Sequence, residues 1–148
     1  MTQDVLLTIS GLHQSEDMAE QTGDMEPIEV ITPAKYFLKN GKHYILYDEV
    51  VEGVPGVIKN KIKIVEDGHL EIIKTGITNS HMVFERGKTY ASSYATPFGM
   101  MAVETKTRAL DIIVQEDLIS VDTDYTLYVN EEVAAECRIV MTIKSKKK

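Results

Sequence analysis

The sequence predicts an all-β protein, a single antiparallel up-and-down β-barrel of about 8–10 strands. Apolar and polar residues alternate with a period of two along most of the 148 residues, which is typical of strands with one buried face. Turn-forming residues recur about every ten positions, as they do in sandwiches and barrels. A sheet of about ten strands tends to curl, and closure removes its exposed edges.

Three tight turns predict three hairpins. Asn40-Gly41 lies between apolar runs, and these two residues tolerate the positive φ that a two-residue hairpin turn requires. Asp67-Gly68 repeats the pattern, and Arg86-Gly87 would place Glu85 opposite Lys88. The expected hairpins span residues 28–49, 56–75 and 78–95.

The last third of the chain predicts three longer strands. The turn "ATPFGM" leads into a strand from Met100 to about Val114, which turns through "QED" and returns as 118–129. A turn through "NEE" then leads to the last strand, 133–143. Between the first strand and the first hairpin, residues 13–27 are polar and acidic, and we expect a mobile loop there. Residues 144–148 form a basic tail, and the whole chain, 1–148, is expected to be one domain.

The register of the last three strands follows from pairing apolar residues with apolar residues. Centring the two turns on Glu116 and Glu131 makes one side of the sheet nearly apolar. The inner pairs expected are Val103–Val129, Thr105–Leu127, Thr107–Tyr125, Val129–Val133, Leu127–Ala135, Tyr125–Cys137, Thr123–Ile139 and Val121–Met141.

The same register places a row of charges on the outer side. Arg108 would lie opposite Asp124, and Asp124 opposite Arg138. Exposed pairs of this kind stabilise a sheet by about 0.2–1 kcal/mol each, so we interpret them as structural. The outer set comprises Glu104, Lys106, Arg108, Asp124, Glu136 and Arg138.

Four hydroxyl side chains interrupt the inner, apolar side: Thr105, Thr107, Thr123 and Tyr125. A buried hydroxyl needs a hydrogen-bond partner, which is another hydroxyl, a backbone carbonyl, a water or a ligand. The register places Thr107 directly across from Tyr125, so a bond between these two hydroxyls is one alternative. A ligand in the barrel interior is the other.

The stretch "TPFGMMAVETKTRAL" resembles the YwiB-like family of small bacterial proteins of unknown function. The resemblance extends to the hairpin "KYFLKNGKHYILYDE", to "IKIVEDGHLEIIKTG", and to Phe98-Gly99 before Thr105 and Thr107. It implies a calycin-like, lipocalin-type β-barrel. It implies no activity, substrate or catalytic residue.

The sequence contains no phosphate-binding glycine loop, no nucleophile elbow, no HExxH and no paired cysteines, the patterns that mark common catalytic and metal sites. Cys137 is expected to be an inert core residue. The four histidines, His13, His43, His69 and His81, are interpreted as surface residues, so we expect no metal and no cofactor. Enzyme function is therefore the weaker interpretation, with Glu104 and Lys106 as the residues to test.

Charge and composition limit partners and location. A net charge of −7 opposes nucleic-acid binding, which draws its affinity from lysine and arginine. No apolar run reaches the roughly 18 residues of a membrane-spanning helix. The single cysteine and the start "MTQDVLLTIS" favour the cytoplasm.

Two functions remain open. In the first, the barrel binds a small, largely apolar ligand, with Thr105, Thr107, Thr123 and Tyr125 inside and with Phe98 and Tyr94 near the mouth. In the second, the barrel is filled and acts as an interaction module, or as a homodimer, through the aromatic hairpin residues Tyr36, Phe37, Tyr44 and Tyr47.

Overall fold

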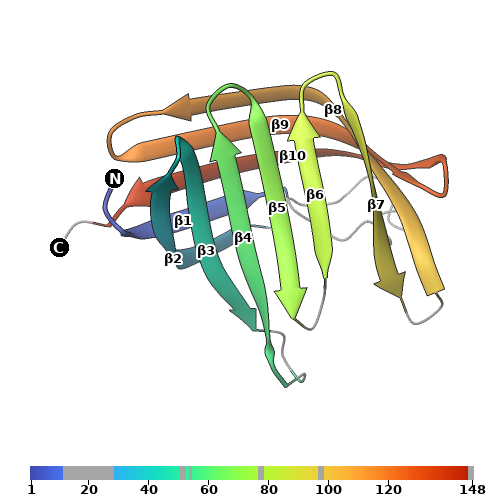
Figure 1. The fold of residues 1–148 in the computed structure, drawn as a ribbon, viewed down its shortest axis with the longest axis horizontal. Coiled ribbons are helices and arrows are strands. Elements are labelled where there is room, and N and C mark those ends of the chain that lie inside the picture. Colours follow the sequence, from blue (N-terminus) through green and yellow to red (C-terminus); the bar gives the residue numbers. More distant parts are fainter. Residues whose placement is uncertain (12–28, 51–52, 54, 77–78, 97–98, 147–148) are drawn as a thin grey trace.

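Ten antiparallel strands form one sheet that curls into a nearly closed barrel (Figure 1). The computed structural model describes residues 1–11, 29–50, 53, 55–76, 79–96 and 99–146, and of 92–96 and 101 it describes the backbone alone. The strands are β1 (Asp4–Ser10), β2 (Glu29–Lys39), β3 (Lys42–Val50), β4 (Val57–Val65), β5 (His69–Gly76), β6 (Ser80–Glu85), β7 (Thr89–Thr96), β8 (Gly99–Val114), β9 (Leu118–Val129) and β10 (Glu132–Ser145). The described residues contain no helix able to span a membrane.

The sheet runs in the order β6-β5-β4-β3-β2-β1-β10-β9-β8-β7. Every strand pairs with a sequence neighbour, and β1 also pairs with β10, which brings the first and last strands together. The predicted hairpin over residues 78–95 is therefore wrong in one respect. Its turn forms, but β6 pairs with β5 and β7 with β8, so the two strands are the edges of the sheet. We call the gap between β6 and β7 the seam.

The turn between β6 and β7 forms hydrogen bonds to β8, and the two strands that it joins do not pair with each other. The amide of Gly87 donates to the carbonyl of Thr107 at 2.9 Å, and the amide of Thr107 donates to the carbonyl of Lys88 at 3.1 Å. Lys88 also pairs with Glu85 at 2.9 Å, as the turn predicts. Backbone hydrogen bonds to β8 thus hold the β6–β7 turn, which lies at one end of the seam.

The other predicted turns form with one change of type. Asn40 and Gly41 have φ values of 54° and 75°, as a two-residue turn between paired strands requires. At the second turn only Gly68 has a positive φ, 115°, because Val65 pairs with His69 across three residues. The expectation that Asp67-Gly68 repeats the Asn40-Gly41 turn is therefore wrong.

Two β-bulges shift the predicted register of β8–β10. Asp124 lies opposite Ala109, not Arg108, because the register changes between Thr107 and Ala109. A second bulge between 133 and 135 pairs Val129 with Glu132 instead of Val133. Each turn also differs by one residue from the predicted one, since Val114 pairs with Ile119 and Val129 with Glu132. The one unpaired residue that each bulge adds offsets this difference, so the pairs on the far side of each bulge from its turn keep the predicted register. The confirmed pairs are Val103–Val129, Thr105–Leu127, Thr107–Tyr125, Leu127–Ala135, Tyr125–Cys137, Thr123–Ile139, Val121–Met141 and Asp124–Arg138.

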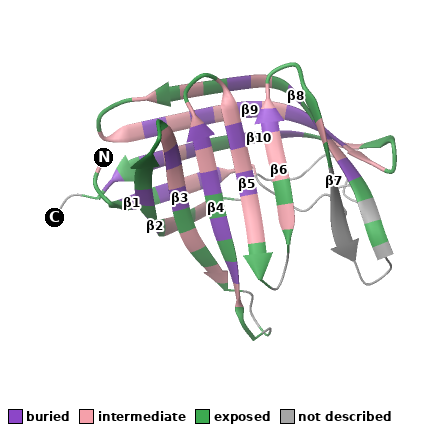
Figure 2. Ribbon diagram, in the orientation of Figure 1, coloured by how far each residue is buried: buried purple, intermediate pink, exposed green. Residues whose placement is uncertain are grey.

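Burial alternates along the strands, as the colours of Figure 2 show, and most of the buried positions carry aliphatic side chains. The largest fully buried side chains are Phe84, Leu7, Ile9, Ile45, Ile62, Ile64, Leu70, Ile72, Ile119, Ile139, Met141 and Ile143. The six charged residues predicted for the outer side are exposed or half-buried, which confirms that assignment. Arg138 pairs most closely with Asp122, at 2.7 Å, and that hydrogen bond lowers the pKa of the Asp122 carboxyl.

The two ends of the chain differ from the expectations for loop and tail. The expected acidic loop, 13–27, lies outside the described residues. Strand β10 extends to Ser145, which is buried and accepts a hydrogen bond from the amide of Thr2 at 3.2 Å. The expected basic tail therefore begins within the strand.

Candidate functional site

The four predicted hydroxyl residues all lie on the inner wall of the barrel. Thr105, Thr107, Thr123 and Tyr125 are each at most 3% exposed. They belong to β8 and β9, and Thr107 lies directly opposite Tyr125 in the ladder. The sequence prediction of a hydroxyl-bearing interior is confirmed.

The hydroxyl groups differ in whether they have a hydrogen-bond partner. Thr123 donates to the carbonyl of Ala109 at 2.7 Å, and Ala109 stands at the β8 bulge. The Thr107 hydroxyl has no hydrogen-bond partner among the described residues, although it is fully buried. The bond between Thr107 and Tyr125, one of the two alternatives, is therefore absent, and Thr107 brings an unpaired hydroxyl to the inner wall.

Tyr125 lies between a ring and a thiol. Its ring packs edge-on against Phe84 of β6, with centroids 4.9 Å apart. Burial raises the pKa of the Cys137 thiol, and a hydrogen bond from Tyr125 lowers it by less. A buried thiol held in its protonated form is a poor nucleophile, which agrees with an inert core cysteine.

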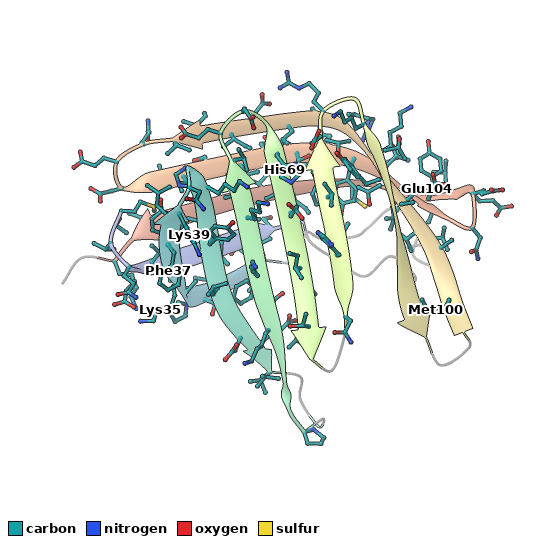
Figure 3. All side chains as sticks on the ribbon, viewed as in Figure 1. Lys35, Phe37, Lys39, His69, Met100 and Glu104 are labelled. Carbon is teal, nitrogen blue, oxygen red and sulfur yellow. The ribbon has the colours of Figure 1, made fainter. Side chains whose placement is uncertain are left out.

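Of the two residues expected near the mouth of the barrel, the structure describes only the backbone of one. Tyr94 lies in β7, where its backbone pairs with Met101. Phe98 lies outside the described residues. Met100, at the start of β8, is 70% exposed (Figure 3).

A second polar group on the inner wall was missed by the sequence analysis. Asn60 of β4 is 2% exposed, and its side-chain amide donates to a carboxylate oxygen of Glu49 and to the carbonyl of Ile58, each at 3.3 Å. Lys74 of β5 reaches the same Glu49 oxygen at 3.1 Å. The side-chain oxygen of Asn60 has no partner among the described residues. The signal was present, because Asn60 alternates with Ile58 and Ile62.

His43 is buried, so its interpretation as a surface histidine is wrong. It is 4% exposed, and its Nδ1 lies 2.7 Å from the hydroxyl of Tyr36, itself 8% exposed. Its Nε2 lies 3.5 Å from a carboxylate oxygen of Glu66 without a hydrogen bond. Burial, followed by the charge of Glu66, raises the pKa of the Tyr36 hydroxyl, so the tyrosine remains a neutral partner for the ring.

Two histidines and two glutamates form a network on the outer side of β5 and β6 (Figure 3 labels His69). His69 contacts Glu85 at 2.6 Å through Nδ1 and Glu71 at 2.7 Å through Nε2, and His81 contacts the other Glu71 oxygen at 2.6 Å. A neutral imidazole carries one N–H, so both bonds of His69 to carboxylates form only when its ring is protonated. Within the described part of the chain, no set of three side chains is arranged to hold a metal.

The network holds its carboxylates in the ionised form. Burial raises the pKa of Glu71, but hydrogen bonds from His69, His81 and Lys63 outweigh it and bring the pKa to about 2. Hydrogen bonds from Lys88, His69 and Tyr90 lower the pKa of Glu85 to about 2 as well.

Acid is expected to weaken the fold through this network. A carboxyl whose pKa is lowered by folding stabilises the native state fully above its unfolded value, and that contribution is lost as the pH falls toward the folded value. For Glu71 this interval runs from 4.5 to about 2. The free energy of unfolding, measured with urea at several pH values, should therefore decrease as the pH is lowered from 4.5 to about 2.

The variant Glu71→Gln should have a smaller fall of the free energy of unfolding across that interval than the parent protein. Glu116→Gln, in the exposed β8–β9 turn, is the matched control and should retain the parental slope. A Glu71→Gln profile parallel to the parental one would show that the network contributes nothing to acid sensitivity.

Two hollows of the described surface lie outside the predicted interior site. One is lined by residues of β1, β2 and β3 together with Lys146. The other lies at the seam, between the β4–β5 turn, the β6–β7 turn and residues 110–112 of β8. The four interior hydroxyls line neither hollow.

Comparison with known proteins finds a match to the model of a family described as a domain of unknown function, DUF1934, over residues 12–141. The uncharacterized beta-barrel protein YwiB of Bacillus subtilis (strain 168) is 26% identical over 117 residues, which cover 79% of this chain and 80% of that protein. The crystal structure of the ywiB protein from Bacillus subtilis superposes with a TM-score of 0.77 at 19% identity, covering 98% of this chain and 93% of that one. These matches support the barrel fold.

Proposed function

The chain belongs to the DUF1934 family, and from that premise we propose that it is a non-catalytic barrel that binds one small, largely apolar molecule in its interior. Small barrels of about eight strands either fill with side chains or hold one small ligand, as lipocalins do. The calycin-like resemblance of the sequence supports the second case. Such a site would combine an apolar wall with a few polar groups.

The observation that carries the proposal is the unpartnered hydroxyl of Thr107 on the inner wall. Leaving a buried polar group without a hydrogen bond costs roughly 1–3 kcal/mol, so a polar atom of a ligand would relieve that cost. Thr123 already donates to Ala109, which makes Thr107 the centre of the proposed site. Thr105 and Tyr125 complete its inner wall, and Tyr94 and Phe98 are proposed for its mouth.

Native mass spectrometry of freshly purified protein tests the proposal. We expect a reproducible extra mass that disappears on denaturation. Thr107→Val should lose that mass while the free energy of unfolding stays equal or rises by about 1 kcal/mol, because the variant removes an unpaired buried hydroxyl. A bare chain mass in both native and denatured samples would overturn the ligand-binding function.

Thr123→Val is the matched control, since it removes a hydroxyl of the same kind that already has a partner. It should lower the free energy of unfolding by about 1–3 kcal/mol, because the Ala109 carbonyl loses its donor. Equal stability losses in both variants would mean that Thr107 has a bound partner of its own in the unliganded protein.

The alternative is an interaction module that works through the aromatic hairpin. Tyr36 is buried, and Tyr47 is half-buried on the inner side, whereas Phe37 is 41% exposed and Tyr44 lies beside it across the ladder. Half of the aromatic residues proposed for that surface are thus available. Light scattering over a concentration series would test a homodimer, and a strict monomer would exclude self-association. We also propose a cytoplasmic location, on the single cysteine.

A further inference from the structure

The outer side of β2, β3 and β4 collects much of the positive charge of this acidic protein. We call it the basic face. Strand alternation directs six lysines outward from these strands, against the acids Glu29 and Asp48, although the chain has a net charge of −7. The lysines are Lys35, Lys39, Lys42, Lys59, Lys61 and Lys63.

Most of these lysines form no ion pair with a described residue, although Asp48 lies opposite Lys59 in the ladder. Lys35 pairs with Asp4, and Lys63 pairs with Glu71 at 3.2 Å. For Lys39, Lys42 and Lys59, the structure gives no ion pair with another described residue. The opposite wall is different, because there Arg138 and Arg108 each reach a carboxylate, Asp122 and Glu136 respectively.

Two aromatic side chains lie side by side among the lysines. Phe37 pairs directly with Tyr44 in the ladder, and Tyr44 pairs directly with Lys63. The Lys61 ammonium lies 5.5 Å from the centre of the Tyr44 ring. Figure 3 shows Lys35, Phe37 and Lys39 one after another along β2. Cations and aromatic rings, one exposed and one half-buried, therefore alternate on one surface.

We propose that the basic face binds single-stranded nucleic acid, with lysines on the phosphates and with Phe37 and Tyr44 stacking on bases. Sequence-independent binders of single strands combine a positive surface with aromatic platforms in this way. The net negative charge predicts no nucleic-acid partner. Net charge is a sum over the whole chain, however, and does not reveal that lysines are concentrated on one surface. Like charges also oppose docking of two copies through this face.

The topology restricts the class of partner. β2, β3 and β4 each have both edges hydrogen-bonded to other strands, so an acidic peptide cannot join the sheet there as an added strand. The outer side of three adjacent strands is too broad to enter the major groove of a duplex, which admits a helix or a two-stranded ribbon. Contacts are therefore made by side chains to a flexible, unpaired strand.

Fluorescence anisotropy with a labelled oligothymidylate of about 12 nucleotides tests this proposal. Binding should weaken between about 50 and 200 mM salt, with log K falling by about 0.7 per neutralised phosphate for each unit of log salt. The double variant Lys59→Glu/Lys61→Glu should lower the affinity at least about tenfold and reduce that slope by about 1.4.

The matched control is Lys106→Glu/Lys144→Glu, which makes the same charge change at exposed positions of β8 and β10. It should keep the affinity within about threefold, since long-range charge effects are screened beyond about 10 Å. Phe37→Leu/Tyr44→Leu should lower the affinity at least about thirtyfold, about fivefold or more for each stacking platform, and leave the salt slope unchanged. Circular dichroism confirms that each variant remains folded.

Three results would overturn the proposal. Equal losses in the two double-lysine variants would mean that net charge alone is responsible. Unchanged affinity in Phe37→Leu/Tyr44→Leu would remove the stacking role. Binding to phosphatidylserine vesicles, without binding to the oligonucleotide, would assign the basic face to a membrane surface.

Discussion

Replacing Phe84 by alanine is expected to lower the free energy of unfolding by about 3–5 kcal/mol, as truncation of a buried phenylalanine does. Phe84 is fully buried, and its ring packs edge-on against Tyr125 at 4.9 Å. It belongs to β6, which is hydrogen-bonded to β5 alone within the described sheet. Tyr125 belongs to β9, two strands in from the other edge, so this ring contact joins the two sides of the seam.

Urea unfolding of Phe84→Ala and Phe84→Leu measures this contribution. The leucine variant keeps most of the buried volume and should lose less than the alanine variant. Phe37→Ala, which removes a 41% exposed ring from β2, is the control and should cost under about 1 kcal/mol. A Phe84→Ala loss as small as that of Phe37→Ala would show that the seam does not depend on this ring.

Gly76→Ala is expected to destabilise the protein by at least about 2 kcal/mol, since a strained backbone conformation costs about 1–3 kcal/mol before any clash. Gly76 has a φ of 117°, and a Cβ atom there would lie 2.4 Å from the carbonyl oxygen of Val57. That oxygen belongs to the backbone of β4 and cannot move without disturbing the β4–β5 ladder, in which Gly76 pairs with Ile58.

Gly68→Ala is the matched control for the backbone conformation. Gly68 has a φ of 115°, and a Cβ atom there would have no neighbour within 4 Å. Its loss in the free energy of unfolding should be about 1–2 kcal/mol, the cost of the left-handed conformation alone. Thermal or urea unfolding of the two variants separates conformation from clash, and equal losses would show that β4 accommodates the added methyl group.

The local elements of the barrel could be predicted from the sequence because each carries its own signal. The Asn40-Gly41 turn and the alternation of β8–β10 predict strands whose described bounds differ by a few residues at most. The bulge near Arg108 was missed, although inward residues change there from odd positions, Thr105 and Thr107, to even ones, Leu110 and Ile112. A register derived from one turn assumes a regular ladder, and a bulge breaks that assumption.

The long-range features could not be predicted in the same way. Arg86-Gly87 looks like a hairpin turn, but whether its strands pair depends on how the whole sheet closes. The pairing of β1 with β10 is set by packing between strands at opposite ends of the chain, which no turn specifies. The inward-facing hydroxyls of the candidate site could be predicted because they interrupt a row of apolar residues. Two other buried polar residues were missed: Asn60, which lies between two lysines, and His43, which lies beside a turn.

The pairing of β1 with β10 also determines when the barrel can be completed during synthesis. Leu7 pairs with Ile143 in that ladder, so one edge of β1 stays uncovered until β10 has been synthesised. The other edge can pair with β2 much earlier. An uncovered edge strand is a template for pairing with another chain. A nascent chain that stalls before β10 is therefore expected to aggregate more readily than the full chain, because that edge of β1 remains uncovered.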